Sequence, residues 1–122
     1  RQRNAAEYRQ LFEASAVCDL VRLPAEADSC TRHIYNQFCI RLPAEQRDAV
    51  WDGLKAAGVG CEVYYPVPLH LQRCFAALRH TEGAFPHAEA AAKESLALPI
   101  YPESTSAQRE YVVATICELL QA

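Results

Sequence analysis

The segment CEVYYPVPLHLQ carries two tyrosines, a histidine and two prolines: Tyr64, Tyr65, His70, Pro66 and Pro68. Each proline has a restricted φ angle and biases the residue before it away from the α-helical region, so the backbone should stay extended here. A stiff loop that is held by its neighbours can present phenol and imidazole groups to a ligand. These residue types therefore predict ligand contact by Tyr64, Tyr65 and His70.

The same side chains also have a structural interpretation. His70 could start a short helix and bond to the backbone, and Tyr64 and Tyr65 could be amphipathic strand residues. His70 and Cys74 stand one helical turn apart, but no CxxC or HxxxH pair accompanies them, so the spacing argues against a metal site. Composition and spacing leave ligand contact and a structural role as alternatives.

The other reactive side chains indicate no catalytic residue and no cofactor site. The sequence has no Gly-rich phosphate loop, GxSxG or HExxH motif. Its two lysines, Lys55 and Lys93, stand among helical positions with solvent-facing neighbours, unlike a desolvated Schiff-base lysine. The six cysteines are expected to be reduced and mostly buried, because the core is ample and no secretion signal is visible.

Size and charge bound the class of protein. The 122 residues, 51% of them hydrophobic, suffice for one domain with a buried core. The net charge of −3 has no long run of one sign, which gives no footprint for nucleic acid or an anionic membrane. No apolar run approaches the roughly 20 residues of a membrane span. A soluble, cytoplasmic protein is expected, and the helical opening RQRNAAEYRQLF without a cap predicts a piece of a longer chain.

Periodicity predicts an α+β fold with helices packed on one face of a sheet of about three strands. The strands are expected at about 17–23, 33–42 and 59–65, the helices at about 1–15, 43–57, 71–78, 86–96 and 105–120, and a buried extended segment at 96–102. Glu89 and Lys93 are placed for an i, i+4 pair, and Thr105 with Gln108 matches a capping box. The core side of the last helix is expected to carry Tyr111, Val112, Ile116, Leu119 and Leu120.

The segment 33–42 has the clearest strand pattern. Its expected core face carries Ile34, Phe38, Ile40 and Leu42, and its polar face carries His33, Tyr35, Gln37, Cys39 and Arg41. The polar face could be an ordinary solvated sheet surface, or the surface that meets the rest of a longer chain.

The order of several segments resembles one family. RQRNAAEYRQLF, HIYNQFCIRL, AAGVGCEVYYPVPLHLQ and FPHAEAAAKESLALPIYPE, followed by a final helix, are similar to the C-terminal part of the DegT/DnrJ/StrS aminotransferases. These enzymes use pyridoxal phosphate to aminate keto sugars carried on nucleotides. The resemblance covers nearly the whole chain, and PxPLHLQ with SLxLPIYPE is its specific part.

The resemblance implies that residues 1–122 are the small C-terminal domain of a fold type I aminotransferase. The Schiff-base lysine, the carboxylate on the cofactor ring and the phosphate-binding residues would then lie in the large domain, outside this chain. The isolated piece would be inactive and without cofactor, while the parent would be a homodimer that uses glutamate as amino donor. A catalytically dead relative that acts as a binding or regulatory protein is the alternative.

Residue by residue, the resemblance places Tyr65, Pro66, Pro68, Leu69, His70 and Gln72 on the family pattern around the sugar-nucleotide cleft. Many members have histidine before the Tyr-Pro pair, where this chain has Tyr64. That departure leaves the role of Tyr64 open between stacking and hydrogen bonding to a different substrate.

Overall fold

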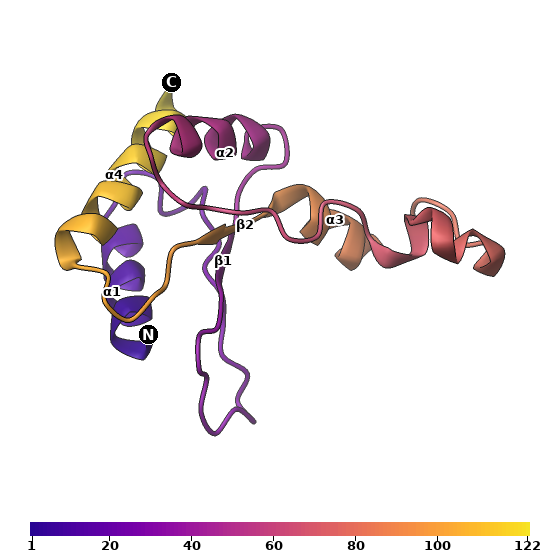
Figure 1. Ribbon diagram of the computed structural model, residues 1–122, viewed down its shortest axis with the longest axis horizontal. Coiled ribbons are helices and arrows are strands. Elements are labelled where there is room, and N and C mark those ends of the chain that lie inside the picture. The colour runs from indigo at the N-terminus through magenta and orange to yellow at the C-terminus, as the bar shows by residue number, and fades with distance from the viewer.

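Four α-helices, two short 3-10 helices and a two-stranded sheet form the structure, a computed structural model that describes residues 1–122 (Figure 1). In chain order they are α1 (Gln2–Glu13), β1 (Phe38–Arg41), α2 (Arg47–Ala56), η1 (Leu69–Leu71), η2 (Arg73–Leu78), α3 (Pro86–Glu94), β2 (Ser95–Leu98) and α4 (Ser106–Gln121). The predicted α+β class is confirmed. No helix has the length and apolar content needed to cross a bilayer.

The sheet is antiparallel and shorter than the sequence pattern predicts. β1 pairs with β2, with Phe38 opposite Leu98 and Arg41 opposite Ser95. Two of the three predicted strands, 17–23 and 59–65, contribute only single bridges, Arg22 to Arg41 and Glu62 to Ala97. β2 comes instead from the end of the predicted helix 86–96 and the extended segment after it. Alternation along one segment cannot say which other segment supplies its hydrogen-bond partners.

The predicted core face of segment 33–42 is wrong at its start. Ile34 is 65% exposed and Tyr35 is 3% exposed, although Phe38, Ile40 and Leu42 are buried as predicted. Tyr35 has a φ of 46°, in the left-handed region, which breaks the two-residue alternation before β1 begins. The Tyr35 hydroxyl donates to Glu26, so its buried polar atom has a partner.

Helices α1, α2 and α4 pack together with β1 and β2 into one body. In Figure 1, α1 and α4 lie to the left of the strands and α2 lies above them. Tyr8 and Phe12 of α1, Leu54 of α2 and Ile116 of α4 are each at most 1% exposed. They belong to an apolar core of 20 buried residues that spans all five elements. The predicted stripe of α4 is wrong for Tyr111, which is 53% exposed.

Residues 66–94 form an arm that leaves the body at the sheet and contains η1, η2 and α3 (Figure 1). No member of the apolar core lies between Val63 and Leu96. The predicted helix at 71–78 forms as the 3-10 helix η2, and none of its residues is buried. The arm is therefore not held by the body's core.

Two local predictions about helix ends and charges have different outcomes. The capping box of α4 is confirmed: the Thr105 side chain accepts from the Gln108 backbone N–H, and the Gln108 side chain accepts from the Thr105 N–H. The predicted Glu89–Lys93 pair is wrong, because Glu89 is buried and bonded elsewhere, while Lys93 lies 3.4 Å from Glu82.

The cysteines are free thiols in the structure, but the prediction that most are buried is wrong. Cys18, Cys30 and Cys74 are exposed, and the other three are half-buried. Cys61 and Cys117 pack against the outside of the apolar core, and Cys74 lies in the arm.

Candidate functional site

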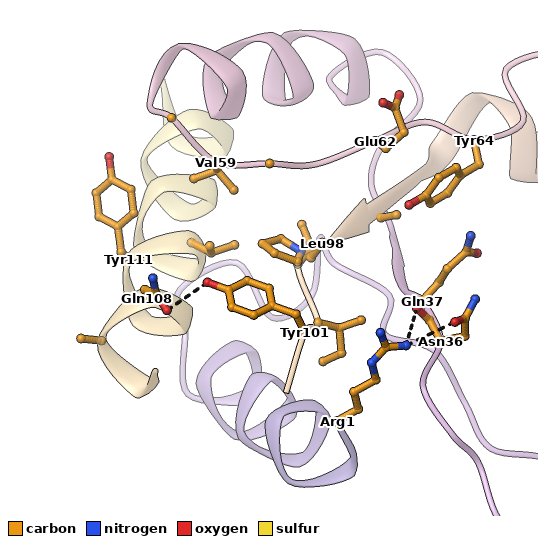
Figure 2. A pocket seen from close by; sticks show the side chains of 17 residues that line it. Arg1, Asn36, Gln37, Val59, Glu62, Tyr64, Leu98, Tyr101, Gln108 and Tyr111 are labelled. Carbon is orange, nitrogen blue, oxygen red and sulfur yellow. Dashed lines mark hydrogen bonds between the residues drawn. The ribbon is translucent and has the colours of Figure 1, made fainter. Parts of the chain in front are cut away.

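A cleft of about 700 Å³ opens beside the sheet, between β2, the N-terminal half of α4 and the segment 58–64 (Figure 2). Its apolar lining comes from Val59, Leu98, Pro99, Ile100 and Val112. Its polar groups include three tyrosines, Tyr64, Tyr101 and Tyr111, that come from three different segments. A cleft with an apolar lining and a few polar groups is the usual form of a small-molecule site.

The capping box of α4 orients part of this cleft. Gln108 Oε1 accepts both from the Thr105 N–H, at 2.8 Å, and from the Tyr101 hydroxyl, at 3.2 Å (Figure 2). On the opposite side, Arg1 donates from Nη1 to the Asn36 side-chain oxygen at 3.2 Å. Several polar groups of the cleft are thus held by hydrogen bonds rather than free to rotate.

The charges of the cleft do not form a phosphate site. Its lining contains one cation, Arg1, and one carboxylate, Glu62. Binding of a phosphate or diphosphate normally uses several backbone N–H groups or cationic side chains together. Any phosphate group of a ligand therefore has to be bound by groups other than these.

A second cavity, of about 370 Å³, lies on the other side of Tyr64. It is bounded by the segment 64–69, here called the strap, and by the alanine face of α3, Ala88, Ala91 and Ala92. Four residues line both cavities, namely Gln37, Glu62, Tyr64 and Ala97. Tyr64 thus stands at the boundary between two hollows that share one edge of the sheet.

The three residues predicted to touch a ligand do not converge. Tyr64 lines both cavities, and Tyr65 lines only the second and is 76% exposed. His70 lines neither. Its side chain is 7% exposed, and its Nε2 lies 2.9 Å from Oε1 of Glu89. The structure thus separates the tyrosines, which face open space, from the histidine, which is enclosed.

The second cavity contains one thiol, that of Cys39. Burial raises the pKa of this thiol above its usual value. The thiolate is the reactive form of cysteine, so the environment of Cys39 disfavours that form. No three His, Cys, Asp or Glu side chains converge in an arrangement that could hold a metal ion.

The chain's own lysines do not fit covalent attachment of an aldehyde cofactor. Lys55 pairs with Asp52 at 2.8 Å and lies over the Trp51 ring, and Lys93 pairs with Glu82. Both side chains are substantially exposed, and neither lines the cleft or the second cavity. A Schiff-base lysine needs a lowered pKa in a desolvated site. Neither Lys55 nor Lys93 therefore fits the covalent attachment of pyridoxal phosphate.

Sequence reasoning missed Tyr101, Gln108 and Tyr111 as cleft residues. Tyr101 was expected in a buried extended segment and Tyr111 on the core side of the last helix, yet both are more than 40% exposed. The Tyr111 hydroxyl donates to the Ala57 carbonyl at 3.1 Å, so its ring lies across the end of α2. Helical periodicity did not indicate this position of the Tyr111 ring. Tyr111 is next to Val112, which is buried, so the pattern assigned both residues to the core side.

The sequence profile of the DegT/DnrJ/EryC1/StrS aminotransferase family matches residues 1–117. A pleiotropic regulatory protein of Geobacillus stearothermophilus is 48% identical over 118 residues, which are 97% of this chain and 31% of that protein. The UDP-N-acetyl-3-dehydro-alpha-D-glucosamine 3-aminotransferase of Acidithiobacillus ferrooxidans is 39% identical over 101 residues, 83% of this chain and 25% of that enzyme.

The fold is similar to those of two solved structures. The aminotransferase TlmJ from Streptoalloteichus hindustanus superposes with a TM-score of 0.81 at 28% identity, over 98% of this chain and 31% of TlmJ. The crystal structure of DesV from S. venezuelae, in complex with a ketimine intermediate, superposes with a TM-score of 0.85 at 30% identity. The superposition covers 99% of this chain and 31% of DesV. The chain thus spans about a third or less of the length of the relatives that it matches.

Proposed function

The chain belongs to the DegT/DnrJ/EryC1/StrS aminotransferase family, and from this premise we propose that it is the C-terminal small domain of a pyridoxal-phosphate-dependent sugar aminotransferase. The longer protein transfers an amino group to a nucleotide-linked keto sugar, for the synthesis of a polysaccharide, a lipopolysaccharide or an antibiotic sugar. The observation that carries this proposal is the family match over residues 1–117. The likeness in sequence and fold to aminotransferases supports it.

The proposal divides the work between this chain and the rest of the longer protein. Pyridoxal phosphate supplies the electron sink for amino transfer when it is bound. Because Lys55 and Lys93 do not fit its attachment, the lysine and the phosphate-binding groups belong to the large domain. The 122-residue chain contributes one wall of the substrate cleft and has no transaminase activity of its own.

Tyr64 and Tyr65 are the substrate-side residues of this proposal. Both are more than half exposed, and together they line the two hollows beside the sheet. A phenol ring can stack on a sugar or base and donate one hydrogen bond. His70 is set apart by its enclosed position against Glu89.

The experiment uses the longer protein, purified and loaded with pyridoxal phosphate. Glutamate is the proposed amino donor, so formation of 2-oxoglutarate in the presence of UDP- or dTDP-linked keto sugars is the expected result. A homodimer is the expected state in solution, measured by light scattering. The purified 122-residue chain is the control, and turnover by it would contradict the division of labour. Absence of cofactor absorbance and of exchange with glutamate in the longer protein would refute the proposed function.

A second function, regulation without catalysis, is favoured by one observation. The Geobacillus relative, at 48% identity, carries the name of a regulatory protein. A regulatory protein without catalysis would not need the Schiff-base lysine, so that lysine is expected to be replaced in it. Sequencing the upstream part of the gene for that lysine separates the two functions.

A further inference from the structure

One carboxylate organises the outer part of the arm. Glu89 of α3 is 8% exposed, and its oxygens accept from three groups that are distant along the chain or in a turn. The Gly83 N–H lies 2.9 Å from both oxygens, the Phe85 N–H lies 3.2 Å from Oε1, and Nε2 of His70 lies 2.9 Å from Oε1. Glu89 therefore joins η1, the turn before α3 and α3 itself.

The hydrogen bonds determine which nitrogen of His70 carries a proton. The N–H of Gly83 is the main cause that lowers the pKa of Glu89 from its usual value, against the opposing effect of burial, and Phe85 and His70 add to the lowering. Glu89 is therefore ionised at neutral pH and has no proton to donate. Nε2 of His70 must then be the donor, which identifies the Nε2–H tautomer or the imidazolium.

The ring of His70 is enclosed by its surroundings. Its side chain is 7% exposed, and the Phe85 ring meets it edge-on at a centroid distance of 4.8 Å. Phe85 also contacts His80 edge-on, at 5.0 Å. The imidazole of His70 thus contacts other residues of the arm, Glu89 and Phe85, and exposes little of its surface to a ligand.

The position of His70 is coupled to the strap. η1 begins at Leu69, directly after Val67 and Pro68, which line the second cavity. Pro66 and Pro68 restrict the backbone on this stretch, so a fixed His70 fixes the strap that precedes it. Gln72, which follows η1, also holds the strap, since its Nε2 donates to the Val67 carbonyl at 3.2 Å.

We propose that Glu89 is a positioning residue for the substrate-side strap, and that His70 is the anchor through which it acts rather than a group that touches substrate. Glu89 holds η1 against α3, and the stiff strap transmits this position to Tyr65 and Tyr64. The inference rests on the proposed function, because only in a sugar aminotransferase is the strap a substrate-side segment. It changes the role of His70 from ligand contact to support.

The first test uses the longer protein loaded with pyridoxal phosphate and measures two quantities. Binding of the unreactive nucleotide sugars UDP-N-acetylglucosamine and dTDP-glucose is measured by calorimetry. Trypsin cleavage after Arg73 and Arg79, both exposed in the arm, reports whether the arm is held. His70→Ala and Glu89→Ala are expected to weaken binding at least about fivefold and to speed cleavage. His70→Ala removes the hydrogen bond between η1 and α3. Glu89→Ala removes it too and also leaves the Gly83 and Phe85 N–H groups without this acceptor.

Two further variants make the test specific. His70→Gln keeps an N–H donor near the position of Nε2 and is expected to restore both binding and resistance to trypsin. Glu82→Ala removes an exposed carboxylate of the same arm, paired with Lys93, and is expected to behave as the wild type. Loss of binding in His70→Ala with unchanged cleavage and no rescue by His70→Gln would show that His70 touches substrate, and would overturn the inference. Equal behaviour of Glu89→Ala and Glu82→Ala would overturn it as well.

A readout on the wild-type protein needs no variant. Nitrogen-15 chemical shifts of the His70 ring are expected to show a proton on Nε2, and a neutral ring protonated only on Nδ1 would overturn the inference. If the wild type binds neither nucleotide sugar, the proposed function fails and the positioning role fails with it. The cleavage rates and the ring shifts would then still decide whether Glu89 holds the arm.

Discussion

The body and the arm are held together by different physical means. The body has an apolar core of 20 buried residues, whereas in residues 66–94 only Glu89 and Ala92 are buried. Half of the twelve exposed large hydrophobic side chains lie in the arm: Val67, Leu69, Leu71, Phe75, Leu78 and Phe85. The arm thus carries several large apolar side chains that it does not bury.

Polar contacts replace the missing core at both ends of α3. At its C-terminal end, Arg47 of α2 donates to the carbonyls of Ala92 and Ser95 at 3.1 and 3.0 Å, and Arg41 pairs with Glu94 at 2.8 Å. At its N-terminal end, Glu89 gathers His70 and the turn at 83–85. The difference teaches that a segment can have a defined shape with few buried apolar contacts if buried polar groups are fully paired.

The largest expected effect contrasts truncation in the two regions. Phe38→Ala should lower the free energy of unfolding by about 3–5 kcal/mol, because Phe38 is fully buried and stacks on Tyr8 at 5.1 Å. Leu78→Ala in the arm, where Leu78 is 61% exposed, should change it by less than about 0.5 kcal/mol. Urea unfolding of the chain checks both. A comparable loss in Leu78→Ala would mean that the arm belongs to the same cooperative core.

A smaller effect is expected from a buried polar group of the body. Asn4 is 1% exposed and donates to the Tyr101 carbonyl at 2.9 Å and to the Ser104 hydroxyl at 3.0 Å. Asn4→Ala should cost about 1–3 kcal/mol, because it removes the hydrogen bonds of a fully buried side chain and leaves a cavity in its place. Gln2→Ala is the matched control, since Gln2 is exposed and bonds only to the His33 carbonyl. Similar unfolding curves for both variants would refute the role of Asn4.

The capping box should give a still smaller change. Thr105→Ala removes the acceptor for the Gln108 N–H and is expected to cost about 1 kcal/mol. Thr115→Ala, in the middle of α4, removes only a bond to the preceding turn and should be neutral within about 0.5 kcal/mol. Urea unfolding followed by circular dichroism measures both. An inverted order of the two variants would show that the cap does not contribute.

The smallest effect on the whole molecule is expected from acid acting on the arm. The pKa of Glu89 is lower in the folded state than its usual value of 4.5. Its stabilising contribution is therefore complete above that value and is lost as the pH falls through the lower, folded-state pKa. Protection of the Gly83 and Phe85 amides from hydrogen exchange should be constant well above the usual pKa of 4.5 and should decrease as the pH falls below it.

A control is needed because acid also acts on other charged groups. Near Glu89, these are His70, His80, Lys93 and Glu82. In the body, the pKa of Glu7 is also lowered, first by its hydrogen bond to Ser106 and then by Arg109. In Glu89→Gln, the pH dependence of Gly83 protection should disappear. Persistence of that dependence in Glu89→Gln would assign it to a different group.

The family, the α+β class and the ends of several helices were predictable from the sequence. Helix ends depend on residues within a few positions of one another, as Thr105 and Gln108 show, so their chemistry is visible locally. Gly58 ends the helix before it with a φ of 77°, in the region that glycine enters without strain. The order of the motifs identified the family, because this order can be read along the sequence without knowing which segments contact each other.

Only the tertiary structure decided which segments meet. Local spacing favoured Lys93 as the partner of Glu89. In the structure, Glu89 is buried and accepts hydrogen bonds from the turn at 83–85 and from His70, nineteen positions away. Tyr35, whose own φ angle lies in the left-handed region, is buried in place of the expected Ile34. Residues 95–98, and not one of the other predicted strands, pair with β1. In each case the free energy depends on burial and hydrogen-bond partners distant in sequence. The position of Tyr64 between two hollows, and of His70 away from both, was decided in the same way.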